Sequence, residues 1–174
     1  GTLIATRRAA IWAQDAFFDR KEEEEDESEG ESETLERLNV ADMAVREAEH
    51  IIGGALFETD LDISHPLGFG FGDRSLAVQR NMTGVLIRPE DDPYAVPLEY
   101  TDDPLLSGYA SQRRQDEIAG TPAVVAERLG RGSVIMMADN PVSRATCPGS
   151  ERLLMNAIFF SPMIDRARGE YEEE

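Results

Sequence analysis

The chain has little cysteine, little lysine and no long apolar run. Its 174 residues contain one cysteine, Cys147, and one lysine, Lys21. A single cysteine excludes an internal disulfide. No stretch approaches the roughly 20 apolar residues of a membrane-spanning helix, so we expect no membrane partner. The chain opens inside an apolar run, and we therefore expect a piece of a longer protein.

Positive charge is also scarce. Lys and Arg number 17 against 35 Asp and Glu, a formal net charge of −18. Because phosphate groups repel such a surface, we expect no nucleic-acid partner. High negative charge keeps a protein soluble in strong salt, where screening relieves its self-repulsion. The composition thus fits a halophilic source, and equally a GC-rich genome with an acidic insertion.

The usual hydrolytic motifs are missing. There is no His-Glu-x-x-His, and neither His50 nor His65 is followed by Glu three residues later. No Gly-x-Ser-x-Gly elbow occurs either. A zinc peptidase site cannot be built from these residues, so we expect no catalytic residue, metal or cofactor in this chain.

The pattern at the start predicts a strand that feeds a helix. Residues 2–6 form a short apolar run, and residues 9–18 follow with helical periodicity. Ile11 or Trp12, with Ala16 and Phe18, would form the buried stripe. A strand that leads directly into a helix is half of a βαβ unit, which points to an α/β sandwich.

The second half contains the clearest pattern. Residues 123–138 are two apolar runs around Gly130 and Gly132, which predicts a β-hairpin. Leu153, Leu154, Ala157, Ile158 and Phe160 recur at helical spacing within residues 149–160 and predict a helix packed on the sheet.

Weaker signals complete a single domain over residues 1–163. Strands are predicted at 51–58, 75–79 and 85–87, an edge strand at 94–100 because of Pro97, and a helix at 111–119 capped by Ser111. Gly68 to Gly72 predicts close backbone packing with two buried Phe rings. Residues 21–37 predict a disordered acidic insertion and 164–174 an acidic tail.

A few polar residues are candidates for a ligand site. Asp62 and His65 lie in a turn-rich stretch, and Asp139, Asn140 and Arg144 lie in the loop after the hairpin. Each has a simpler structural role as a turn, cap or solvated charge, and His65 is fixed in an extended conformation by Pro66. Cys147 would be a nucleophile only with a base nearby.

Three stretches together resemble one family. They are Gly54 to Phe57 through Asp62 to Phe71, Tyr100 to Tyr109, and Ala126 to Asn140 running into Arg152 to Phe160. They resemble the C-terminal region of bacterial zinc carboxypeptidase-like proteins of the carboxypeptidase A superfamily. In that family a class I glutamine amidotransferase-like domain with a flavodoxin-like α/β sandwich follows the peptidase domain.

The resemblance implies a domain that keeps the amidotransferase fold but lacks its catalytic residues. An active glutaminase has a Cys at the elbow between a strand and the next helix, whereas this chain has Thr6-Arg7-Arg8 there and no His-x-Glu partner pair. The zinc ligands would lie upstream, in a peptidase domain that would be the main partner, and the protein would be secreted or periplasmic. The chain would start partway through the sandwich, leaving the sheet incomplete at its N-terminal side.

Three hypotheses follow. The first is a noncatalytic accessory domain, with a homo-oligomer as an open possibility. The second is a small hydrolase or amidase that uses Cys147 or His65. The third is a peptide- or sugar-binding module whose loops carry the candidate ligand residues.

Overall fold

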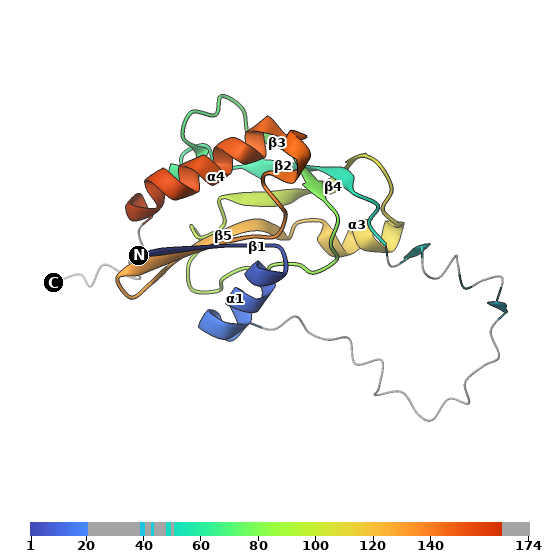
Figure 1. Ribbon diagram of the computed structural model, residues 1–174, viewed down its shortest axis with the longest axis horizontal. Coiled ribbons are helices and arrows are strands. Elements are labelled where there is room, and N and C mark those ends of the chain that lie inside the picture. The colour runs from blue at the N-terminus through green and yellow to red at the C-terminus, as the bar shows by residue number, and fades with distance from the viewer. Residues whose placement is uncertain (21–38, 41–42, 44–47, 50, 165–174) are drawn as a thin grey trace.

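The protein is a mixed α/β structure built on one curled, six-stranded sheet, seen in a computed structural model (Figure 1). The structure describes residues 1–20, 39–40, 43, 48–49 and 51–164. The acidic insertion and nearly all of the acidic tail that the sequence predicts lie outside these described residues. The strand order is β1-β6-β5-β4-β2-β3.

The elements follow one another in a simple order. The strands are β1 (Thr2–Thr6), β2 (Ala55–Leu61), β3 (Ser75–Arg80), β4 (Leu98–Ser107), β5 (Pro122–Leu129) and β6 (Gly132–Met137). The α-helices are α1 (Arg8–Phe18), α3 (Gln112–Ile118) and α4 (Pro148–Phe160). Short 3-10 turns are η1 (Pro66–Gly68), η2 (Ser143–Ala145) and η3 (Ser161–Met163).

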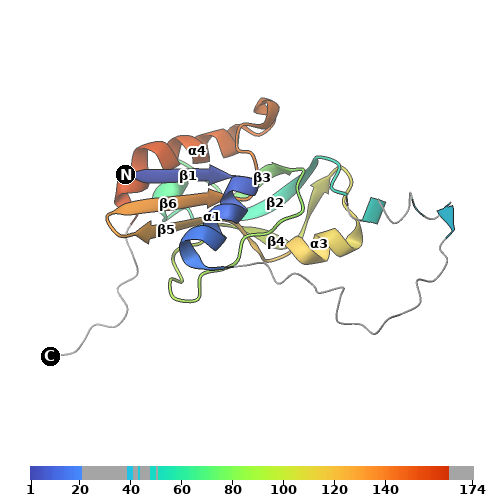
Figure 2. The ribbon, with the colours of Figure 1, turned by 60° about the horizontal axis from the view of Figure 1, so that its bottom comes forward.

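Helices cover both faces of the β1/β6 half of the sheet (Figures 1 and 2). The two strands are parallel, and side chains along β6 alternate between the faces. Ile135 and Met137 pack into the cluster that contains Leu153 of α4. Val134 and Met136 pack into the cluster that contains buried alanines of α1. This half is a three-layer sandwich, as the strand-to-helix pattern predicts.

The β5–β6 hairpin confirms the strongest sequence prediction. Leu129 pairs with Gly132 across the tip, and the ladder runs back to the pairing of Val124 with Met137. Gly130 has a φ of 57°, which glycine adopts at low cost. The predicted helix at 149–160 is α4, which begins one residue earlier.

The other half of the sheet is antiparallel and corrects two strand predictions. β4 pairs with β5 on one side and β2 on the other, so it is a central strand and not the predicted edge. Pro97 precedes its first residue, and the Pro97 carbonyl accepts a hydrogen bond from the Asp62 amide. Residues 85–87 form no strand.

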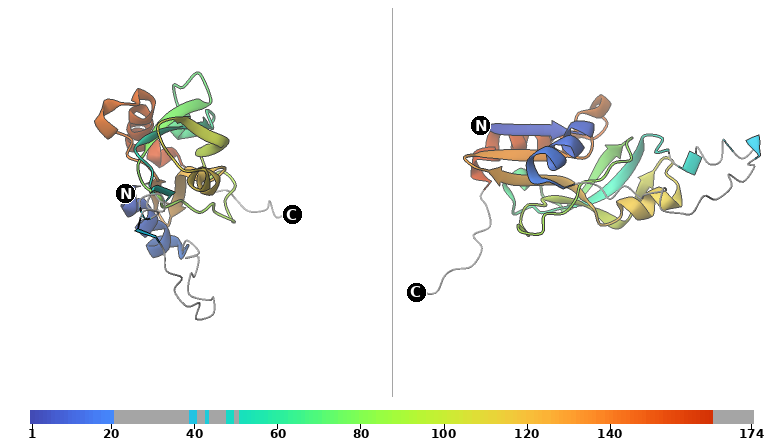
Figure 3. Two further views of the ribbon diagram at one scale, coloured as in Figure 1. Left: turned by 90° about the vertical axis from the view of Figure 1, so that its right-hand side faces the viewer. Right: turned by 90° about the horizontal axis from the view of Figure 1, so that it is seen from below.

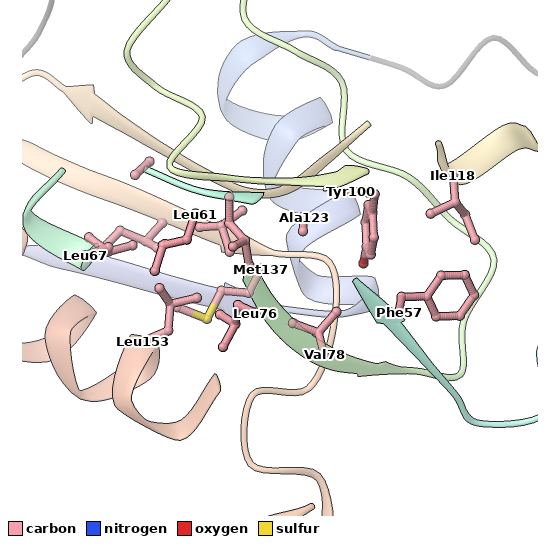
Figure 4. Close-up of a cluster of buried hydrophobic side chains, with 14 of the residues drawn as sticks. Phe57, Leu61, Leu67, Leu76, Val78, Tyr100, Ile118, Ala123, Met137 and Leu153 are labelled. Carbon is pink, nitrogen blue, oxygen red and sulfur yellow. The ribbon is translucent and has the colours of Figure 1, made fainter. Parts of the chain in front are cut away.

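The main core lies between α4 and the sheet (Figure 4). Leu153 of α4 faces Met137 and Leu76, while Tyr100 stands among apolar side chains at the far end of the cluster. Of the two rings predicted to be buried near Gly68, Phe69 is 65% exposed, and Phe71 is half-buried. Gly68 itself is tightly packed, because an added Cβ would lie 2.4 Å from the Asp62 carbonyl oxygen.

The buried stripe of α1 matches the prediction in part. Ile11 and Phe18 pack against the core, but Ala10, Ala13 and Gln14 are the buried residues, Ala16 is exposed and Trp12 is 61% exposed. The Gln14 side chain accepts a hydrogen bond from the Ile87 amide, so a polar residue takes a core position. Within the described part of the chain, no helix has the length and apolar character needed to span a membrane.

Candidate functional site

The most unusual backbone geometry of the protein lies where the two parallel strands, β1 and β6, end side by side. β1 ends at a turn through Arg7 that begins α1, and β6 ends at Met137, after which residues 138–147, Asp139 among them, lead to α4. The Arg7 amide donates to the Met137 carbonyl at 2.8 Å, which holds the turn against β6. The carboxyl ends of parallel strands are where α/β proteins place their ligand sites.

Arg7 has a strained backbone. Its φ is 56° and its ψ is −130°, a region that residues with a side chain rarely adopt. The Arg7 carbonyl accepts from the amides of Ala10 and Ile11 and so starts the helix. A sharp strand-to-helix turn with such a residue is the geometry of a nucleophile elbow. Here the side chain at that position is an exposed guanidinium.

Behind this turn lies a buried polar cluster formed by Arg80, Tyr100 and Asp139. Arg80 Nη1 donates to the Tyr100 hydroxyl at 2.9 Å and lies 3.3 Å from Asp139 Oδ1. The Tyr100 hydroxyl donates to the second oxygen of Asp139. Arg80 Nη2 donates to the Gly84 carbonyl at 2.5 Å. Four parts of the chain are thus joined at one point inside the molecule.

Burial governs the ionisation of this cluster. Arg80 is fully buried and Tyr100 nearly so. Burial raises the pKa of Asp139, although the charge of Arg80 and the hydrogen bonds from Tyr100 and Arg80 oppose the rise. Burial, and then the Asp139 charge, raise the pKa of Tyr100 well above its usual value. Burial acts to lower the pKa of Arg80, but Tyr100 and Asp139 together raise it. The Tyr100 phenol therefore stays protonated at neutral pH, and the charge of Arg80 offsets part of the cost of burying Asp139.

The loop after β6 is held mainly by its own polar groups. Asn140 Oδ1 accepts from the Val142 amide at 3.2 Å. The Ser150 hydroxyl is placed between the carbonyls of Pro141 and Cys147, at 2.7 and 2.8 Å. These bonds fix the backbone between β6 and α4.

Two further residues of this loop are candidates from the sequence: Arg144 for ligand binding and Cys147 as a nucleophile. Arg144 is exposed and has a φ of 51°. Burial and the nearby Asp139 charge raise the pKa of the Cys147 thiol, so the thiol stays protonated at neutral pH. Within the described residues this thiol has no hydrogen-bond partner, and a thiol without a base is a poor nucleophile.

Asp62 and His65 lie elsewhere, in the loop after β2. Asp62 Oδ1 accepts from the Ser64 amide at 2.9 Å and from its hydroxyl at 2.6 Å. His65 Nδ1 accepts from the Leu67 amide at 3.1 Å and caps η1. Burial lowers the pKa of His65, and Asp62 and Asp92 partly oppose this. Among described residues, no hydrogen bond or ion pair joins this loop to the candidates after β6.

Arg80 and Tyr100 are not among the site residues that the sequence predicts. One local signal points to Arg80: Leu76, Val78 and Arg80 alternate along β3, so the arginine occupies an inward position. Nothing local indicates its partner, because Asp139 is 59 residues away along the chain.

Two hollows lie between described residues, one beside Asp139 and one that none of the candidate residues lines. A cavity of about 20 Å³, enough for about one water molecule, borders Asp139 and Ser150. A hollow of about 570 Å³ lies between the end of α1, residues 87–92 and the end of β5. Its lining includes the ion pair of Arg20 with Glu127, at 2.5 and 3.0 Å.

Neither metal-ligating side chains nor comparison with known proteins assigns a function to this site. In the part of the chain that the structure describes, no group of three or more His, Cys, Asp or Glu side chains is placed to hold a metal ion. The expectation that this chain binds no cofactor stays a prediction. Comparisons of the chain with protein-family models, curated proteins and solved structures return no match.

Proposed function

We propose that this chain is a noncatalytic accessory domain of a zinc carboxypeptidase-like protein, with the scaffold of a degenerate class I glutamine amidotransferase. The proposal starts from the three stretches of sequence resemblance. The observation that carries it is the conformation of Arg7: a strained turn between β1 and α1, where a glutaminase of this fold holds its nucleophilic cysteine.

An arginine at this turn supplies no covalent chemistry. A guanidinium has N–H donors only and no lone pair available for attack. Strained backbone persists only where the surrounding structure imposes it. Retention of the strain without a nucleophile fits a scaffold descended from an enzyme and now used for packing or for positioning a substrate.

The remaining reactive groups support the same proposal. The His65 nitrogen that could act as a base accepts the Leu67 amide instead, and Asp139 is occupied by Arg80 and Tyr100. Cys147 has a raised thiol pKa. A hydrolase or amidase needs a nucleophile and a base in contact, and no such pair occurs among the described residues.

A flavodoxin-like core would correspond to the β1–α1 and β6–α4 units. These provide the parallel pair and one helix on each face. The pairings among β6, β5, β4, β2 and β3 are all antiparallel, so this part of the sheet would be an elaboration of the sandwich. The accessory role, the upstream zinc domain and a secreted or periplasmic location all belong to this proposal.

The gene that encodes the chain tests the parent assignment. We expect it to encode a His-x-x-Glu motif and a later His upstream of Gly1, and the peptidase domain so defined to co-purify with this chain when the two are expressed separately. An upstream region without such a motif would remove the zinc carboxypeptidase assignment. An upstream peptidase that neither binds the chain nor changes activity in its presence would remove the accessory role.

A further inference from the structure

The outer side of α4 carries apolar side chains where a helix that faces water usually has polar ones. Residues 153–164, the greater part of α4 together with η3, contain no charged residue, although 30% of the chain is charged. One side of α4 packs into the core through Leu153 and Ala157. The other side exposes large apolar residues, namely Met155, Ile158 and Phe159, which are 49%, 52% and 66% exposed. Because these residues are three and four positions apart, they form one stripe on the helix surface.

α3 shows the contrast. Its exposed polar side chains bond to one another: Gln112 Nε2 donates to Asp116 Oδ1 at 2.8 Å, and Arg113 Nε donates to Glu117 Oε1 at 2.8 Å. Such a face is typical of a helix that remains in water. The stripe on α4 is instead typical of a surface that another protein covers. Aromatic residues and Met are enriched in protein interfaces, whereas Asp, Glu and Lys are depleted there.

The loop after η1 extends the stripe with one more aromatic ring. Phe69 is exposed, and its ring meets the ring of Phe160 edge-on, with the centroids 5.0 Å apart. The backbone that carries Phe69 is fixed to α4, because Asn156 Nδ2 donates to the carbonyls of Leu67 and Phe69 at 2.7 and 2.9 Å. These bonds hold the Phe69 ring beside the helix, where it widens the apolar surface.

The N-terminus lies beside the end of the same surface (Figures 2 and 3). The Thr2 hydroxyl donates to the Ser161 hydroxyl at 2.8 Å, and Ser161 directly follows α4. Met163, two residues further along in η3, is 66% exposed. η3 also packs against η1, the turn that precedes Phe69. A polypeptide attached to Gly1 would therefore leave the domain next to this apolar surface.

We propose that the surface formed by Phe69, Met155, Ile158, Phe159 and Met163, here called the α4 face, is where the domain that precedes Gly1 in the full polypeptide docks. This inference rests on the proposed function, which places a peptidase domain there, and it names the surface through which the two domains pack. The matching surface of the upstream domain is apolar with charges at its rim, because a charge set against the α4 face would be buried without a partner.

Composition and charge argue against the other occupants. Residues 165–174 directly follow the α4 face along the chain, but most of them are charged and only Tyr171 is aromatic. A second copy would bring together two chains that each have a net charge of −18, and an anionic membrane would repel the same charge. A domain joined at Gly1 is favoured instead, because the covalent link gives it a high effective concentration beside the α4 face.

Methionine oxidation tests the docking surface. Dilute hydrogen peroxide converts exposed methionine to its sulfoxide, and mass spectrometry of peptides locates the modified residues. In the separate chain of residues 1–174, Met155 and Met163 should oxidise readily. In the full polypeptide we expect both to be protected. Met43 is the matched control, since it is 55% exposed and lies outside the α4 face, and it should oxidise equally in both forms.

Two results of this experiment would overturn the proposal. One is equal oxidation of Met155 and Met163 in the separate chain and in the full polypeptide. The other is protection of these residues in the separate chain that increases with its concentration, because a second copy would then be the occupant.

A substitution checks that protection comes from this contact. Phe159→Glu places a charge within the α4 face, and Trp12→Glu is the control, because Trp12 is also an exposed aromatic residue on a helix, 61% exposed on α1. In the full polypeptide, Phe159→Glu should restore oxidation of Met155 and Met163, whereas Trp12→Glu should not. The affinity of the separately expressed upstream domain should fall more than about tenfold with Phe159→Glu. Since both positions are exposed, both variants should keep the circular dichroism spectrum of the parent. Continued protection in Phe159→Glu contradicts the proposal.

The outcomes separate this inference from the proposed function. Protection by an upstream domain that lacks the His-x-x-Glu motif would retain the α4 face as an interface and remove the zinc carboxypeptidase assignment. An upstream peptidase domain that leaves Met155 and Met163 open to oxidation would retain that assignment and overturn the docking surface.

Discussion

Arg80 Nη1 lies 3.3 Å from Asp139 Oδ1, and both side chains are buried, with 0% and 10% of their surface exposed. This contact ties the end of β3 to the end of β6, on either side of the central strands. Tyr100 from β4 completes it by bonding to both. The cluster therefore links the two halves of the sheet at the edge where α/β proteins usually bind ligands.

Removing Arg80 should strongly destabilise the fold. Arg80→Met leaves the Asp139 carboxylate buried without its cation, which typically costs about 3–5 kcal/mol in the free energy of unfolding. Urea unfolding at neutral pH, followed by circular dichroism, measures the loss. Arg88→Met is the control, because Arg88 and Glu99 form an ion pair with 51% and 38% of their side-chain surface exposed. Such a pair contributes about 0–1 kcal/mol. Equal effects of the two substitutions would contradict a structural role for the cluster.

His65 should make stability depend on pH near neutrality. Burial lowers its pKa in the folded state below the ordinary 6.5. The unfolded chain therefore binds a proton that the folded chain does not, and stability is present above pH 6.5 and lost as the pH falls through the folded pKa. His65→Asn keeps an acceptor for the Leu67 amide and removes the titration. The free energy of unfolding of this variant, measured from neutral pH downward, should lack the decline seen in the parent over that window. A parallel decline in both proteins would assign the effect to other groups.

Relieving the strain at Arg7 should stabilise the protein. Glycine adopts a φ of 56° with a ψ of −130° readily, whereas a residue with a Cβ pays about 1–3 kcal/mol. After the extra freedom that glycine gives the unfolded chain is subtracted, Arg7→Gly should gain roughly 1 kcal/mol. Arg8→Gly, at the first residue of α1, should lose stability instead, because glycine is a poor helix former. Chemical unfolding of the two variants measures the contrast. A loss of stability in Arg7→Gly would show that the side chain of Arg7, rather than the turn alone, holds this end of the sheet.

Salt should stabilise the folded chain if repulsion among its negative charges lowers its stability. Screening of the net charge of −18 should raise the melting temperature as KCl is added. Replacing Glu22, Glu23, Glu24 and Glu25 by Gln removes part of that charge and should reduce the salt response. A melting temperature that stays flat or falls with KCl argues against a halophilic adaptation.

Local patterns predicted local structure well. The β5–β6 hairpin follows from two apolar runs around a glycine that tolerates a positive φ. The Ser111 hydroxyl accepts from the Arg114 amide at 3.3 Å, as its position before a helix predicts. In both cases the deciding contacts lie within a few residues of one another.

Predictions that depended on distant partners failed for a physical reason. Pro97 predicts an edge strand, but it precedes the first residue of β4 and so removes no ladder hydrogen bond from a central strand. In α1, the exposed Trp12 and the buried Gln14 reverse the hydrophobic order, because Gln14 finds a backbone partner at Ile87 that periodicity cannot reveal. The Arg80 cluster was missed in the same way.

The proposal that this chain is noncatalytic is tested most directly by a turnover assay. The purified chain, incubated with glutamine and with a panel of esters and amides, should show no saturable turnover. Cys147→Ala and His65→Asn should be indistinguishable from the parent in that assay. Saturable turnover that disappears in Cys147→Ala would contradict the account, because it would place a working nucleophile in a domain that we describe as a scaffold.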